Sequence, residues 1–75
     1  MTTATLTAIR EDFYANGQYH GDGESWAEID GNPHEWLEET IRVDRENSTD
    51  CQAGEYSIYQ ISDGENVVMM QRVNW

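Results

Sequence analysis

Carboxylates are the side chains of this sequence with the greatest capacity for chemistry. Fifteen Asp and Glu residues stand against four Arg and no Lys, which gives a formal net charge of −11. No basic residue lies between Arg10 and Arg42. The acids of that stretch form a candidate partner-binding surface, which we call the acidic arc. Its members are Asp22, Glu24, Glu28, Asp30, Glu35, Glu38 and Glu39.

The charge of the chain restricts the partners that it can bind. Proteins that grip DNA or RNA do so with Lys and Arg, and anionic membrane surfaces also attract basic residues. We therefore expect no direct binding to nucleic acid and no binding to membranes. Opposite charges attract and speed association, so the expected partner is the basic surface of a nucleic-acid-binding protein. The sequence leaves open whether the chain also forms a homodimer.

Patterns typical of enzymes, metal sites or cofactor sites are weak or missing in the sequence. His20, His34 and Cys51 are scattered, without the close pairing of zinc ligands. The segment that starts at Asp30 resembles a calcium loop for a few positions, but Glu35 occupies the place where that loop requires Gly. Glycine-rich nucleotide-binding motifs are absent. We expect no enzyme activity, no metal and no cofactor.

Length and composition indicate one folded domain over residues 1–75. Hydrophobic residues make up 37% of the chain and include three Trp, four Tyr and one Phe, too many for a disordered acidic tail. Cys51 is the single cysteine, so no internal disulfide can form. The N-terminus lacks the features of a signal peptide, and no apolar run approaches a membrane span. These features predict a protein of the host-cell cytoplasm.

The clearest local pattern is a helix that begins at Pro33. Asn is a favoured N-cap and Pro is favoured at the first helical position. At about 100° per residue, apolar and acidic side chains separate cleanly onto two faces. Asp44 would fall on the apolar face, so the expected helix covers 33–43. Glu35, Glu38 and Glu39 lie three and four residues apart on its solvent face.

Four segments read as strands. The first is expected over 3–9 from its alternating pattern, although Leu6, Ile9 and Phe13 also match helical spacing. The second lies within 19–29, with 25–29 as its better half. The last two cover 55–61 and 66–73 and flank a turn containing Asp63-Gly64. The expected fold is α+β: a small antiparallel sheet of three to four strands in β-β-α-β-β order, with one amphipathic helix on one face.

A set of short segments is similar to a known family. They are the strand Thr5-Leu6-Thr7-Ala8-Ile9, the turn Asn16-Gly17, His20-Gly21 followed by Trp26, the helix from Pro33, and the segment Gly54-Glu55-Tyr56-Ser57-Ile58-Tyr59. In this order they resemble the N-terminal domain of ArdA-type antirestriction proteins, over residues 5 to about 60. The resemblance implies an acidic DNA mimic, of a family carried by plasmids and other mobile elements, that blocks type I restriction enzymes by filling their DNA groove.

Two functional hypotheses follow. The first is a DNA mimic that occupies the nucleic-acid-binding site of a host defence complex, either a restriction enzyme or a CRISPR effector. The second is a small acidic domain or adaptor of a halophile, in which the carboxylates serve adaptation to salt and imply no partner. The acidic arc has a function only under the first hypothesis.

Overall fold

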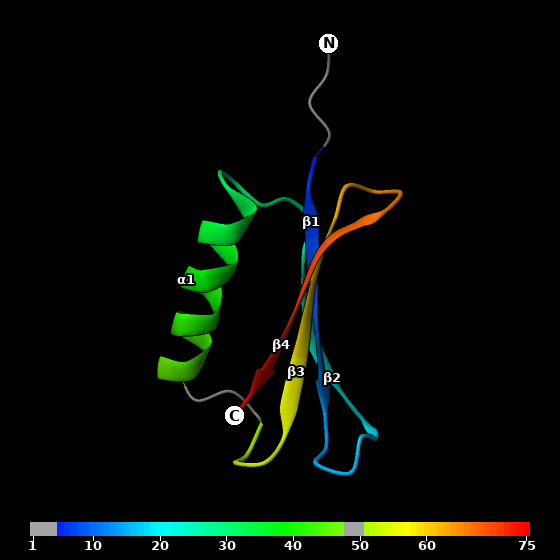
Figure 1. Cartoon of the computed structure of the whole chain (residues 1–75), viewed down its shortest axis with the longest axis vertical. Helices are drawn as coiled ribbons and strands as arrows, with labels where there is room; N and C mark the ends of the chain where they lie inside the picture. Colours follow the sequence, from blue (N-terminus) through cyan, green and yellow to red (C-terminus); the bar gives the residue numbers. More distant parts are fainter. Residues whose placement is uncertain (1–4, 48–50) are drawn as a thin grey trace.

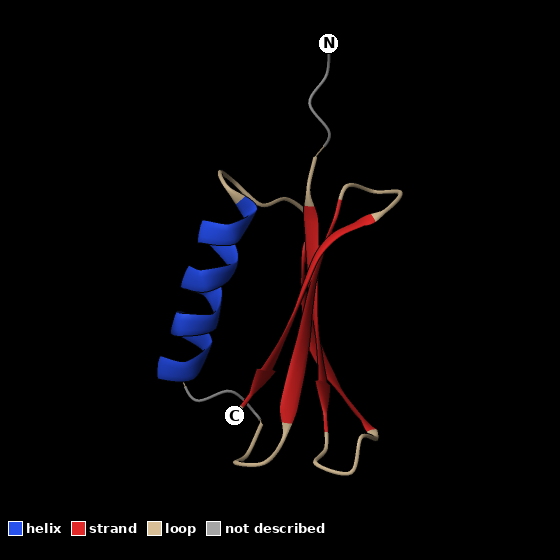
Figure 2. Ribbon diagram, in the orientation of Figure 1, coloured by secondary structure: helices blue, strands red, loops and turns tan. Residues whose placement is uncertain are grey.

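The fold is a four-stranded antiparallel sheet with one helix on one face. The computed structural model describes residues 5–47 and 51–75, apart from the side chain of Asp22. Its elements in chain order are β1 (Thr7–Phe13), β2 (Tyr19–Trp26), α1 (Pro33–Glu46), β3 (Tyr56–Ser62) and β4 (Val67–Asn74). The strands lie in the order β2-β1-β3-β4, and α1 covers one side of them (Figures 1 and 2). The predicted α+β fold is confirmed.

The first strand lies later in the chain than expected. It covers Thr7–Phe13, whereas the alternating pattern predicted 3–9, of which 3 and 4 lie outside the described residues. The position is set by the hairpin, in which Phe13 pairs with Tyr19 across a turn where Gly17 has φ of 91°. That turn and the pairing of all seven β1 residues with β3 place the strand at its centre. Tertiary pairing therefore outweighed the local pattern.

The second strand lies within 19–29 as predicted, but 25–29 is not its main part. Strand β2 covers Tyr19–Trp26 and starts directly after the turn. Gly23 allows the close pairing, since a Cβ atom there would lie 2.4 Å from the backbone oxygen of Arg10. Beyond the strand, Ile29 is buried and its N–H donates to the carbonyl of Leu6 over 3.0 Å. Ile29 thus belongs to the core but not to the sheet.

The helix starts where predicted and ends later than predicted. The side chain of Asn32 accepts hydrogen bonds from the N–H groups of His34 and Glu35, as an N-cap does. The helix was expected to stop at Val43 but continues to Glu46. Asp44 does point to the sheet side, where partners described below hold its carboxylate. A buried acid was therefore wrongly taken as a stop.

The core lies between α1 and the sheet. Its buried apolar residues are Ala8, Ile29, Leu37, Tyr59, Ile61 and Val73. Trp26 and Trp36 pack edge to face at the margin, with ring centroids 5.1 Å apart. The opposite side of the sheet, which we call the open face, is not covered by any described element (Figure 1). Within the described residues, no helix has the length and apolar character that crossing a membrane requires.

Candidate protein-binding surface

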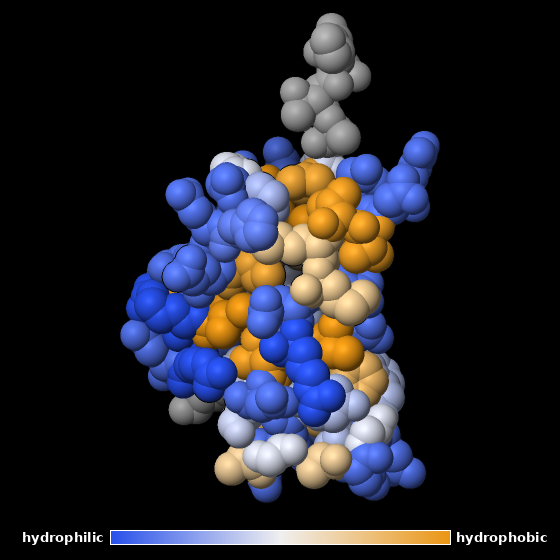
Figure 3. All heavy atoms as spheres, in the orientation of Figure 1, coloured by the Kyte–Doolittle hydropathy of each residue, from blue (hydrophilic) through white to orange (hydrophobic). Residues whose placement is uncertain are grey.

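The centre of the acidic arc is the outer face of α1. Glu35, Glu38 and Glu39 are exposed there and line a shallow hollow together with Arg42. This confirms the helical placement predicted from their spacing. Hydrophilic side chains cover the outer side of the helix in the space-filling view, while hydrophobic ones gather between helix and sheet and over the upper part of the sheet (Figure 3).

The three glutamates of this face differ in how far their charge is already neutralised. Arg42 forms ion pairs with Glu39 and with Glu46, the latter at 2.8 Å. The hydrogen bond from Arg42 lowers the pKa of Glu39, and the two carboxylates raise the pKa of Arg42. By contrast, the carboxylates of Glu35 and Glu38 make no ion pair with a described residue. These two charges are therefore the ones most available to a partner.

The loop that leads into α1 carries the next part of the arc. Glu28 and Asp30 are exposed on either side of the buried Ile29, and neither forms an ion pair with a described residue. Ile29 anchors this loop to the core, so the two acids are held next to the start of the helix. An unpaired acidic segment thus runs from the loop onto the helix.

The two remaining residues of the acidic arc, Asp22 and Glu24, come from β2 and are not part of this loop-and-helix segment. The carboxylate of Glu24 lies 3.8 Å from Nη1 of Arg10, with half of its side chain exposed. It therefore faces the helix side of the sheet and contributes to an internal charge cluster. The side chain of Asp22 lies outside the described residues. The structure brings Glu35, Glu38 and Glu39 together on α1, places Glu28 and Asp30 in the loop before it, and leaves Glu24 apart on β2.

The internal charge cluster was missed by the sequence analysis. Arg10 has a side chain only 5% exposed and lies under α1, where its Nε is 3.0 Å from Asp12 and its Nη1 is 3.0 Å from Asp44. The Nε contact is an ion pair with poor hydrogen-bond geometry, since no acceptor aligns with that N–H. The second contact to Asp12, from Nη2 at 3.3 Å, does meet hydrogen-bond criteria. Burial tends to lower the pKa of Arg10, but Asp12 and Asp44 outweigh it and raise the pKa.

Neutral polar side chains complete the cluster. The hydroxyl of Tyr59 donates to Asp44 over 2.5 Å, and that of Ser57 donates to Asp12 over 2.6 Å. The indole N–H of Trp75 then donates to Ser57 over 2.8 Å. Burial, followed by the bond to Asp44, raises the pKa of Tyr59. The one available sequence clue was Arg10 and Asp12 two residues apart, which places both on one face of a strand.

This cluster is better explained by structure than by catalysis. Its carboxylates are occupied by Arg10, Tyr59 and Ser57, and α1 covers them from solvent. Among the residues that the structure describes, no group of three or more His, Cys, Asp or Glu side chains is placed to hold a metal ion. Cys51 lies 3.6 Å from the Ser57 hydroxyl, and burial raises the pKa of its thiol, so it is a poor nucleophile at neutral pH.

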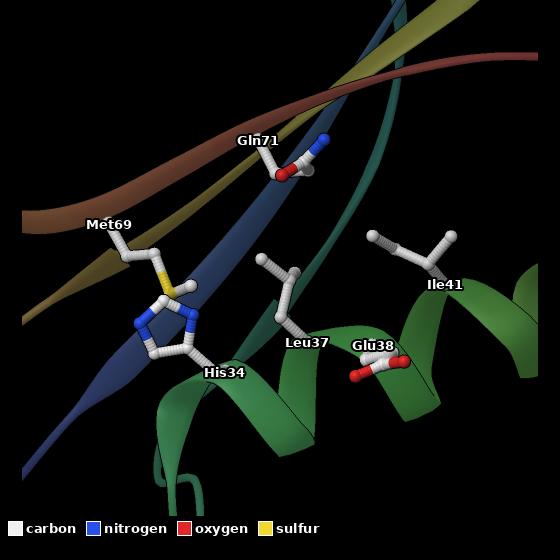
Figure 4. Close-up of a pocket in the computed structure, with 6 residues that line it drawn as sticks. All are labelled: His34, Leu37, Glu38, Ile41, Met69 and Gln71. Atoms are coloured by element: carbon white, nitrogen blue, oxygen red, sulfur yellow. The ribbon is translucent and has the colours of Figure 1, made fainter.

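A second hollow lies between α1 and β4. Leu37 and Ile41 point from the helix toward Gln71, while His34 lies near Met69 (Figure 4). Glu38 stands at the helix margin of this hollow. Its lining is half apolar and half polar, and no hydrogen bond or ion pair is seen among the side chains of His34, Glu38 and Gln71. The hollow shows no catalytic arrangement.

The sequence matches no protein-family model, and no curated protein or solved structure is significantly similar to it. The resemblance to ArdA-type proteins thus remains a hypothesis that rests on the short segments given above.

Proposed function

We propose that this protein is an acidic DNA mimic from a phage or mobile element. In this role it blocks the nucleic-acid-binding site of a host defence complex, either a restriction enzyme or a CRISPR effector. The observation that carries the proposal is the run of exposed carboxylates from Glu28 and Asp30 to Glu35 and Glu38, none of which forms an ion pair within the described part of the chain. No Lys or Arg lies within residues 28–38, so this run presents an excess of negative charge to a partner.

Two features support mimicry over an ordinary solvated surface. Carboxylates one helical turn apart have Cβ atoms roughly 5–6 Å apart and repel one another, which costs stability unless a basic partner compensates. Arg42 lines the same hollow but forms its ion pairs with Glu39 and Glu46, so among the described residues Glu35 and Glu38 stay without an ion pair. The charges of such a mimic would meet the Lys and Arg that otherwise hold phosphates.

The decisive experiment is a protection assay with charge-reversed variants. Phage plating is measured on cells that carry a type I restriction enzyme or a CRISPR effector and that express the protein. Wild type is expected to protect at least one of the two strains. Glu35→Lys combined with Glu38→Lys is expected to abolish protection, because like charges then face the basic groove. The fold is expected to survive, since both side chains are exposed and self-repulsion falls.

A matched control separates this surface from net charge. Gln18→Lys, Glu65→Lys and Asn66→Lys together change the net charge by the same amount, at exposed positions outside the arc. This variant should protect as well as wild type. Equal protection by the arc variant and wild type would contradict the proposal, as would micromolar binding of wild type to duplex DNA in a gel shift at about 150 mM salt.

A further inference from the structure

The open face of the sheet carries more apolar surface than a solvent-facing sheet normally does. Half-covered antiparallel sheets are usually polar on the outer side. Here Ile9 is 39% exposed and Met70 is 58% exposed, on strands β1 and β4. Exposed apolar residues gathered on one face mark an interaction surface. The same positions point away from α1, because Ala8 next to Ile9 is buried, and Met69 and Gln71 on either side of Met70 line the hollow against α1.

Aromatic side chains at one end of the open face form a preorganised ladder. Phe13 meets Tyr19 edge to face at 5.8 Å between centroids and stacks on Tyr56 at 5.1 Å. The guanidinium of Arg72 lies 4.0 Å from the centre of the Tyr56 ring. These contacts hold Arg72 in place at low conformational entropy, as a binding surface requires.

The open face is also the part of this acidic molecule where charges balance. Among the described strand side chains that face it, the charged ones are Glu11 and Arg72. Neither forms an ion pair with a described residue, and the one hydrogen bond of the Arg72 side chain runs from Nε to Asn74 over 3.0 Å. Two copies that each carry −11 repel one another elsewhere, so a near-neutral face is where they can meet.

Strand register makes this face complementary to itself. Glu11 pairs with Ile58 on β3, and Ile58 pairs with Arg72 on β4, so the two charges flank Ile58 in one row. We infer that the open face binds a second copy of this chain about a two-fold axis. The axis lies between the two sheets, runs along β3 and passes close to Ile58. Such an axis exchanges the two sides of the row, so each Arg72 faces Glu11 of the other copy.

The neighbouring row supports the same axis. Ile9 pairs with Gln60 and Gln60 pairs with Met70, again one strand to either side of β3. The two-fold therefore places Met70 of one copy on Ile9 of the other, which buries the two exposed apolar side chains. A two-fold axis across the strands would instead put Glu11 on Glu11 and Arg72 on Arg72. Charge thus selects one of the two ways to stack the sheets.

Known sheet packing accommodates this arrangement. Two sheets stacked face to face lie about 10 Å apart with strands within about 30° of alignment. Interdigitated Ile and Met side chains and a Glu–Arg pair fill that gap. The result is a four-layer dimer with α1 and its acidic surface on both outer sides. The inference is independent of the proposed function, since it uses the opposite side of the sheet.

Charge exchange in the full chain tests the pairing of Glu11 with Arg72. Sedimentation equilibrium should show twice the 8.6 kDa mass of the chain for wild type. Arg72→Glu and Glu11→Arg should each raise the dimer dissociation constant at least tenfold, about 1.4 kcal/mol. The double variant with both changes should recover the wild-type constant. Arg42→Glu, which makes the same charge change on the outer face of α1, should leave the dimer intact.

Two outcomes would overturn the inference: wild type that stays monomeric at millimolar concentration, or a folded double variant that does not recover association. Circular dichroism establishes folding for each variant. A cross-linking measurement avoids charge reversal altogether. With Cys51→Ser, a cysteine introduced by Ile58→Cys lies at the axis and should give a covalent dimer with a short bismaleimide. Ser25→Cys, on the same face of β2 but two strands away from β3, should not. Equal cross-linking of both would exclude this axis.

Discussion

Arg10 and Asp44 are 34 residues apart in sequence, yet Nη1 of Arg10 lies 3.0 Å from Oδ2 of Asp44. This ion pair joins the middle of β1 to the last turn of α1. The same carboxylate accepts the Tyr59 hydroxyl, so one acid ties the helix to two central strands. The contact holds the last turn of α1 against the central strands of the sheet.

Removing one partner of this pair should strongly destabilise the protein. Arg10→Met leaves Asp12 and Asp44 without their counter-ion, and breaking a buried pair costs about 3–5 kcal/mol. Asp44→Leu should destabilise for the same reason. The double variant should lose less than the sum, because no buried charge of this pair is then left alone. Urea unfolding of all four proteins measures the coupling; strict additivity would show that the contact is not formed in solution.

The Tyr59 hydroxyl should make stability depend on alkaline pH. Burial and the bond to Asp44 raise its pKa above the ordinary value of about 10. Below that value the hydroxyl is protonated in both states and its contribution is fully present. As pH rises above about 10, the unfolded state ionises first, so folding stability falls.

Tyr59→Phe should remove this part of the alkaline loss and cost about 1–3 kcal/mol at neutral pH, since Asp44 loses a donor. The measurement is the melting temperature of both proteins between neutral and alkaline pH. Parallel pH profiles would contradict the assignment. Tyr14→Phe, at an exposed position, provides the control.

Leu37 and Ile41 should differ in what they contribute to folding. Both side chains lie on the sheet-facing side of α1, but Leu37 is 3% exposed whereas Ile41 is only partly buried beside the hollow between α1 and β4. Leu37→Ala should cost about 2–5 kcal/mol, enough to unfold much of so small a domain. Ile41→Ala should cost less, because solvent and neighbouring side chains can relax into the site. Chemical denaturation that ranked Ile41 above Leu37 would mean that the helix is rotated.

Salt separates mimicry from adaptation to a saline cell. Screening of self-repulsion at −11 should raise the melting temperature as salt increases from about 10 mM to about 150 mM. If the charges serve a partner, the protein should be fully folded at about 150 mM. A halophile domain should fold only at molar salt. Circular dichroism along a salt series distinguishes the two, and the second result would remove the main reason for the proposed function.

The sequence was sufficient to predict those features of the structure that depend on interactions within one short segment. Asn32-Pro33 located the start of α1, and the separation of apolar from acidic residues located its faces. The turn at Asp63-Gly64 located the hairpin of β3 and β4, where Asp63 accepts from the N–H groups of Glu65 and Asn66. Helical spacing also placed Glu35, Glu38 and Glu39 on one solvent face. Each of these features depends on contacts within a few residues.

Features that depend on residues far apart in the sequence could be determined only from the tertiary structure. The extent of β1 follows from its pairing with β2 and β3, which no alternation within residues 3–9 can reveal. Asp44 continues the helix because Arg10, far away in the chain, neutralises it. In the same way, the ion pair with Arg42 neutralises Glu39, and the contact with Arg10 places the carboxylate of Glu24 on the helix side of the sheet. A sequence shows which residues are charged, but the free energy of each charge in the folded protein depends on its neighbours in space.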